Sequence, residues 1–146
     1  MTDFDKINEC RNSLVTNIYE PEENALAIEI ILGRPEEKKR EIFINDISLG
    51  MGKQIIYDDN SEKFTISFNS YISYFILNES FDGGFEGEYT GNRIRLYTKS
   101  AFIDFCKRET LGFQIIDNNA IKHFMLVTQR HIINVLTISE LIINKA

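Results

Sequence analysis

The sequence contains few of the residues that build metal centres and disulfide frameworks. It has two cysteines, two histidines, two prolines and no tryptophan among 146 residues. Cys10 and Cys106 stand far apart and form no CxxC pair, which argues against a redox motif and a disulfide framework. Neither the cysteines nor the histidines offer the close-spaced ligand pair that a zinc site uses. We therefore predict a reduced protein without a metal site.

Long hydrophobic runs are missing as well. The most apolar stretches, residues 25–32 and 132–143, are short and are interrupted by Glu29, Asn134 and Glu140. A membrane-spanning helix needs about 20 unbroken apolar residues. The first six residues carry acids where a secretory signal carries bases, and no apolar region follows them. The expectation is a cytoplasmic protein that does not enter membranes.

Positive charge is the third shortage. The chain has 22 acidic and 16 basic residues, for a net charge of −6. Such a balance opposes attraction to the phosphates of nucleic acids and to anionic membrane surfaces, so neither is expected as a partner. Four of the acids fall within residues 79–88, where no lysine or arginine interrupts them. This distribution favours a basic partner.

A chain of this length is expected to form one domain, residues 1–146, with a core large enough to need no disulfide. Apolar residues recur every three or four positions from Phe4 to Ile18, which predicts a helix over about 3–18 that ends before Pro21. A second helix is predicted after Ser100, whose side chain caps it, and before Gly112.

Alternating and β-branched segments predict the strands. Residues 53–57 and 63–68 flank the turn formers 58–61 and predict a hairpin. Residues 64–77 fit one long bent strand or two short ones, and the tail from Ser139 is ambiguous. Residues 79–91 hold four glycines and four acids and are expected to form an exposed loop. Further strands are predicted at 26–31, 42–47, 93–97, 122–128 and 131–137.

These elements predict an α+β fold. The strands follow one another mostly through tight turns, with one helix at the N-terminus and one in mid-chain. The expected architecture is a curved, largely antiparallel sheet of about six to seven strands.

No catalytic or cofactor motif is complete. The run from Gly50 to Lys53 lacks the first glycine of a phosphate-binding loop, and Gln54 replaces the Ser or Thr that holds magnesium. A hydrolase triad could be drawn from Ser100, Asp104 and either histidine. Ser100 lacks the GxSxG elbow, however, and is better explained as a helix cap. We predict that the chain is not an enzyme and requires no cofactor.

The acidic segment carries the first candidate site. Exposed aromatic residues among carboxylates provide apolar anchors within a negatively charged rim, as protein-binding surfaces do. The predicted partner-binding residues are Glu79, Phe81, Asp82, Phe85, Glu86, Glu88 and Tyr89.

A pocket in the curved sheet is the alternative site. Aromatic walls with a few polar groups suit a small ligand. The residues predicted to line it are Tyr71, Tyr74, Arg93, Arg95 and Tyr97.

Three segments of the C-terminal half resemble a group of small bacterial proteins associated with toxin–immunity neighbourhoods. They are Tyr-Ile-Ser-Tyr-Phe-Ile-Leu-Asn-Glu-Ser at 71–80, the Tyr-Thr-Lys-Ser-Ala-Phe element within 93–105, and His-Ile-Ile-Asn-Val at 131–135. The resemblance implies a strand ending at the first segment, a strand-to-helix turn at the second and a late core strand at the third. It implies a cytoplasmic binding protein, with no catalytic residues to carry over and no named partner.

Together these observations predict a protein-binding module, most simply an immunity-type inhibitor that covers a basic toxin surface with its acidic loop. The alternatives are a small-ligand-binding protein or enzyme with a pocket in the sheet, and a self-associating subunit that buries the apolar tail 141–143. The sequence leaves the oligomeric state open.

Overall fold

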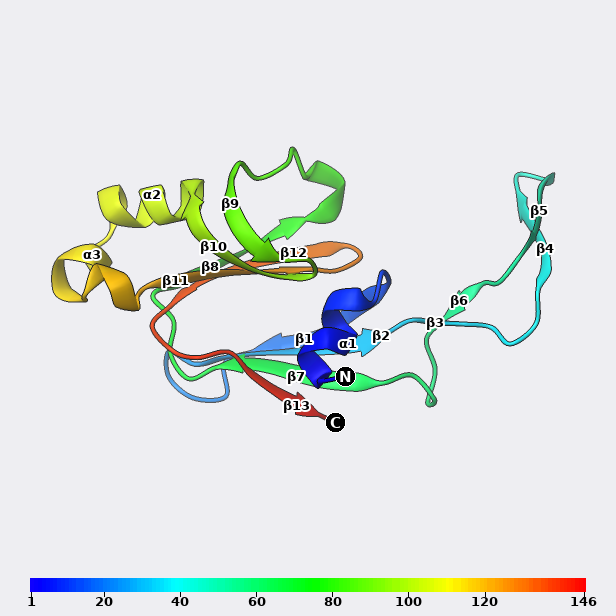
Figure 1. Ribbon diagram of the computed structural model, residues 1–146, viewed down its shortest axis with the longest axis horizontal. Coiled ribbons are helices and arrows are strands. Elements are labelled where there is room, and N and C mark those ends of the chain that lie inside the picture. The colour runs from blue at the N-terminus through cyan, green and yellow to red at the C-terminus, as the bar shows by residue number, and fades with distance from the viewer.

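The computed structural model describes residues 1–146. Two antiparallel sheets lie face to face, helices cover the outer face of one of them, and a thin arm projects from this body (Figure 1). None of the helices has the length and apolar content that a membrane crossing requires. The helices are α1 (Asp3–Glu9), α2 (Ala101–Glu109) and α3 (Gly112–Ile115), with short 3-10 turns η1 (Glu79–Phe81) and η2 (Asn118–Ala120).

The body contains nine strands in two sheets. The first sheet has the order β1 (Ser13–Tyr19), β2 (Leu26–Leu32), β7 (Lys63–Phe68) and β13 (Ile142–Lys145). The second has the order β8 (Ser73–Asn78), β12 (His131–Thr137), β11 (Lys122–Val127), β10 (Ile94–Ser100) and β9 (Gly87–Gly91). The α+β prediction with mainly antiparallel strands is confirmed, but the strands form several small sheets rather than one curved sheet.

The main core lies between these two sheets. Alternate residues of each strand point into it, because successive side chains of a strand face opposite sides of the sheet. Burial of each such side chain is worth about 1.5–3 kcal/mol relative to exposure. The buried residues are Ile7, Leu26, Ile28, Ile30, Leu32, Phe64, Ile66, Phe68, Ile94, Phe124, Leu126, Ile133 and Val135.

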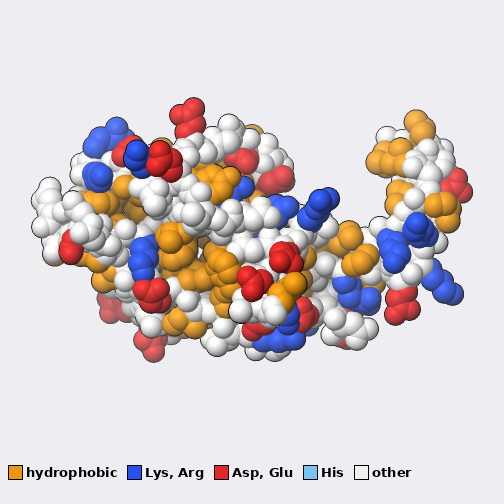
Figure 2. Space-filling view, viewed as in Figure 1, with side chains coloured by type: hydrophobic (Ala, Val, Ile, Leu, Met, Phe, Trp, Pro, Cys, Tyr) orange, Lys and Arg blue, Asp and Glu red, His pale blue; other side chains and the backbone are white.

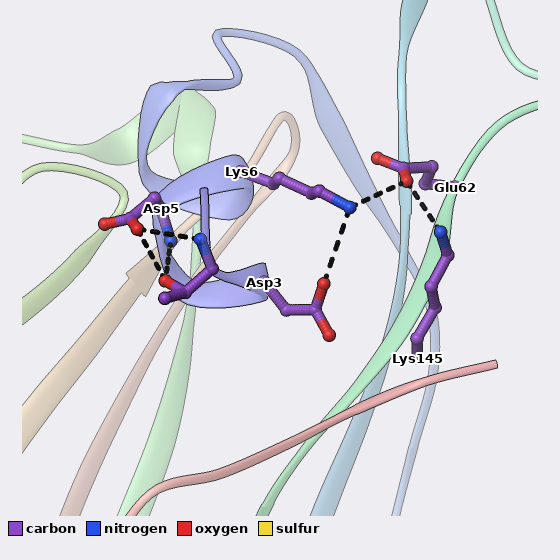
Figure 3. A network of polar contacts seen from close by, with 6 residues as sticks. Asp3, Asp5, Lys6, Glu62 and Lys145 are labelled. Atoms are coloured by element: carbon purple, nitrogen blue, oxygen red, sulfur yellow. Dashed lines mark hydrogen bonds and ion pairs between the residues drawn. The ribbon is translucent and has the colours of Figure 1, made fainter.

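Helix α1 closes one edge of the core and is held by its first turn and by charges. Thr2 and Asp5 form a capping box. Lys6 Nζ and Lys145 Nζ lie 3.2 and 2.8 Å from the same carboxylate oxygen of Glu62, which lowers the pKa of Glu62 (Figure 3). These partly exposed contacts join the helix to the ends of β7 and β13 and are each worth at most about 1 kcal/mol.

The predicted helix over 3–18 is wrong in its second half. The helix ends at Glu9, and residues 13–19 form β1, which pairs with β2 through a register shift between Val15 and Asn17. The β-branched residues Val15, Thr16 and Ile18 favour a strand when an apolar neighbour strand is available. Tertiary pairing therefore overrides the helical spacing of the apolar residues.

The predicted hairpin across 58–61 is also wrong. β7 pairs with β2 and β13, whereas β6 (Ile55–Ile56) pairs with β3 (Arg34–Pro35). The segment 64–77 divides into β7 and β8, which belong to different sheets. The ambiguous tail forms β13, so residues 141–143 lie half-buried against the chain's own core.

The arm replaces the strand predicted at 42–47. β4 (Arg40–Ile44) and β5 (Ile47–Gly52) form a hairpin around Asn45 and Asp46, whose φ angles are 50° and 62°. Two consecutive positive φ angles are the signature of a type I′ turn, which asparagine and aspartate tolerate. With β3 and β6 at its base, this hairpin extends away from the body (Figure 1).

Candidate protein-binding surface

The acidic segment follows β8 and leads into β9, the edge strand of the second sheet. Local hydrogen bonds shape its first half: the backbone N–H groups of Ser80 and Gly84 donate to Asn78 Oδ1 and Asp82 Oδ1, at 3.0 and 2.9 Å. Gly87 begins β9 with φ of 156°, and a Cβ there would lie 2.2 Å from the carbonyl oxygen of Lys99. Residues 79–91 are therefore a turn, a loop and an edge strand rather than a loop throughout.

The predicted partner-binding residues lie open to solvent with one exception. Phe81 and Tyr89 are 77% and 44% exposed, whereas Phe85 is half-buried. Phe85 packs on Phe75 with a centroid distance of 5.9 Å and fixes the loop to the sheet. The four carboxylates are all exposed, and only Glu88 forms an ion pair, 3.5 Å from Lys99.

Phe85 stands between two cavities on this side of the molecule. The first, of about 380 Å³, is an apolar cleft between the loop, β8 and α2. The second, of about 240 Å³, is lined by both polar and apolar groups. The apolar cleft is lined by Ser73, Phe75, Phe85, Ala101, Phe102 and Phe105, and the second cavity by Asp82, Gly84, Phe85, Tyr89, Arg95, Met125, Val127 and Ile132.

Arg95 joins this surface, although the sequence analysis assigned it to the other site. Its guanidinium carbon lies 4.5 Å from the centre of the Tyr89 ring, and its Nε donates to the carbonyl oxygen of Asn92 at 2.9 Å. A cation over an aromatic face is held electrostatically, by about 0.5–1 kcal/mol at an exposed site. The structure thus gathers Asp82, Phe85, Tyr89 and Arg95 around one cavity.

The five residues of the predicted sheet pocket do not line one cavity. Tyr71 and Tyr74 pack edge to face at 4.8 Å against the core between the sheets. Tyr97 is 2% exposed and lies on the opposite face of the second sheet with Arg95, while Arg93 precedes β10. Alternation along the strands separates these side chains, which the sequence analysis grouped by residue type alone.

Tyr71 has a role in joining segments. Its hydroxyl donates a hydrogen bond to the carboxylate of Glu20. That bond to an anion, followed by partial burial, raises the pKa of Tyr71 to about 12. Tyr71 therefore remains a neutral hydrogen-bond donor in the contact between the β7–β8 connection and the end of β1.

A buried polar chain lies beneath α2. Ser100 Oγ is 2.7 Å from His123 Nδ1, and His123 Nε2 is 2.8 Å from Asn134 Oδ1. Ser100 Oγ also accepts from the backbone N–H of Ile103 at 3.1 Å, so the predicted helix cap is present. Asn134 Oδ1 only accepts, so His123 Nε2 carries the proton and donates to it. In the neutral ring Nδ1 is then an acceptor, and the serine O–H donates to it.

The hydrogen-bonded series Ser100–His123–Asn134 resembles a hydrolase triad only in its residue types. Ser100 is 5% exposed and His123 and Asn134 are fully buried, whereas Asp104 is exposed on α2 and forms no hydrogen bond with any of them. Burial lowers the pKa of His123 to about 4, which keeps the imidazole neutral. The sequence analysis placed a histidine beside Ser100 only as part of a triad with Asp104, and it missed Asn134. His123 on β11 opposes Leu136 on β12, and Asn134 lies two residues along β12, so the two side chains become diagonal neighbours only in the folded sheet.

Comparisons with known proteins add no relative. No protein-family model matches the chain, and no curated protein or solved structure matches it at a significant level. No group of three or more histidine, cysteine, aspartate or glutamate side chains is arranged to hold a metal ion.

Proposed function

We propose that this chain is a protein-binding module, an immunity-type inhibitor that captures a basic protein on its acidic segment. One observation supports this most directly. Phe81 and Tyr89 are 77% and 44% exposed among four carboxylates, and Phe85 of the same segment lines an apolar cleft of about 380 Å³. Large exposed aromatic side chains are costly to leave in water and are typical anchors of protein interfaces.

The charges and the aromatics have separate tasks in this proposal. Three of the four carboxylates lack an ion-pair partner within the chain, so their field is available to attract a basic surface. The aromatic rings and the cleft then provide apolar area, which supplies affinity once water leaves. The cleft is large enough to accept one or two apolar side chains from the partner.

Reversal of the acidic charges tests the proposal. A variant with all four carboxylates replaced by lysine is expected to bind the partner on the order of 100-fold more weakly at low salt, because attraction becomes repulsion. The difference should shrink as salt increases, since exposed charges are screened within about 10 Å at 0.1 M. The measurement is affinity capture from the native host followed by binding titrations of the retained protein. The substitutions are Glu79→Lys, Asp82→Lys, Glu86→Lys and Glu88→Lys.

A matched control separates location from net charge. Four other exposed acids, reversed together, give the same net charge but leave the acidic segment intact. The expected result is a basic protein that the control retains and the segment variant loses. Equal retention by both variants, or loss from both, would remove the acidic segment from the interface. The control substitutions are Glu22→Lys, Glu23→Lys, Asp59→Lys and Glu109→Lys.

The second cavity supports the small-ligand alternative. Asp82 and Arg95 provide opposite charges at its rim, while Met125 and Ile132 form apolar walls. A metabolite that fits, present at 100 times its dissociation constant, would stabilise the fold by about 2.7 kcal/mol. A thermal-shift screen is expected to show this as a rise of roughly 5–10 °C. The shift should disappear in Arg95→Met, and its persistence there would place the ligand elsewhere.

A further inference from the structure

The arm exposes an unusual amount of apolar surface. Ile44, Ile47 and Leu49 are 58%, 66% and 62% exposed. Directly opposed residues of an antiparallel pair project to the same face, and Ile44 pairs with Ile47. Ile42 and Leu49, each two residues away along its own strand, share that face. Ile42, Ile44, Ile47 and Leu49 form the aliphatic face of the arm.

This face has no cover within the chain. A two-stranded hairpin alone is marginally stable in water, and it normally gains stability by packing its apolar face on another layer. The arm extends away from both sheets, and hydrophobic side chains gather at its outer end (Figures 1 and 2). The aliphatic face therefore fits a flat apolar surface of similar size on a second molecule.

The charges of the arm favour a second copy of this chain as that molecule. Residues 34–56 carry five basic and four acidic residues, a net charge of +1, which leaves −7 for the rest of the chain. At the base of the arm Arg40 pairs with Glu36, while three lysines, Lys38, Lys39 and Lys53, and one acid, Glu37, form no ion pair, and the tip holds Asp46. Two arms packed antiparallel would place each acidic tip against the basic base of the other arm.

We infer that the aliphatic face of the arm is a self-association surface, on which a second copy of this chain packs its own arm in antiparallel orientation. This arrangement is a two-fold interface, the commonest symmetry of soluble oligomers. It keeps the two acidic bodies at opposite ends, whereas a parallel arrangement would bring the −7 bodies together. It uses a surface separate from the acidic segment, so each can fail without the other.

The interface would be modest in size. Two such faces bury on the order of 1,000 Å² in total, close to the lower limit of specific interfaces. We therefore expect a weak dimer, with a dissociation constant of about 10 µM. Insertion of the arm into a membrane is disfavoured by the charge of the body and by Asn45 and Asp46, which would enter the bilayer first.

Sedimentation equilibrium of the full chain from about 1 to 500 µM tests the inference. Ile44→Glu with Ile47→Glu is expected to raise the dissociation constant at least 30-fold, because four carboxylates would meet in the dimer. The matched control is Phe43→Glu with Met51→Glu, which adds the same charge to the opposite face of the same hairpin. The control should change the dissociation constant less than threefold.

The orientation has its own test. Asp46→Lys should weaken the dimer about tenfold at low salt, and adding Lys38→Glu and Lys39→Glu should restore it. A wild-type chain that stays monomeric at 500 µM, or equal effects of the two glutamate pairs, would overturn the inference. A monomeric chain that floats with vesicles of phosphatidylserine and phosphatidylcholine, and loses this in Ile44→Glu, would assign the arm to membranes instead.

Discussion

Ser100→Ala is expected to lower the free energy of unfolding by about 2–4 kcal/mol. The substitution removes the N-terminal cap of α2, worth about 1 kcal/mol. It also leaves His123 Nδ1 buried without a donor, which costs about 1–3 kcal/mol. Both losses arise from one hydroxyl, because Ser100 Oγ accepts from Ile103 and donates to His123 at the same time.

Thermal and urea unfolding measure this effect. A loss of this size should lower the melting temperature by roughly 5–15 °C for a chain of this length. Ser80→Ala is the control, since Ser80 is exposed and its hydroxyl makes no hydrogen bond. The control should stay within about 0.5 kcal/mol of the wild type. Equal stability of Ser100→Ala and the wild type would show that the buried hydrogen bonds from Ser100 through His123 to Asn134 contribute nothing to the free energy of unfolding.

The second large effect is the dependence of stability on pH. The pKa of His123 is about 4 in the fold and about 6.5 in the unfolded chain, because burial penalises the imidazolium. Between these values the unfolded state binds more protons, so protonation favours unfolding. The contribution of His123 is complete above pH 6.5 and is lost as the pH falls toward 4. The loss is about 2 kcal/mol by pH 5 and about 3 kcal/mol in full.

Urea titrations at pH 7.5 and 5, on the wild type and on His123→Gln, isolate this group. Glutamine retains polar atoms toward Ser100 and Asn134 but does not titrate. Asp58 and Glu62 have lowered pKa values, and their stabilisation is lost as the pH falls through the acidic range, but both proteins share it. The wild type should lose about 2 kcal/mol more than His123→Gln. Parallel losses in both proteins would contradict a neutral, buried His123.

The acidic surface and the arm divide the binding tasks of the chain between two places. The acidic segment is fixed to the body at Phe85, which packs on Phe75, and leaves Phe81 exposed. Tyr89 is partly exposed between Arg95 and Tyr97. The arm is joined to the body only through its base, where Arg34 pairs with Asp58. A dimer formed through the arms would present two acidic surfaces, and a partner with two basic sites would bind it with increased avidity.

Local signals in the sequence were sufficient where one residue and its neighbours decide the structure. Thr2 with Asp5 and Ser100 with Ile103 cap helices through contacts three residues apart. The apolar runs at β2, β11 and β12 predicted strands because buried β-branched and aliphatic residues suit a pleated sheet. The exposure of the acidic segment followed from its glycines and charges.

By itself the sequence determined the class of fold, the second helix and the composition of the acidic segment. Only the tertiary structure decided that the strands divide between two sheets, that residues 34–56 leave the body as an arm, and that Arg95 rather than Tyr71 lies beside Tyr89. The reason is that strand pairing joins residues far apart in the chain, and neither spacing nor propensity records the partner. The His123 contacts to Ser100 and Asn134 exist for the same reason, since they depend on the register of three strands.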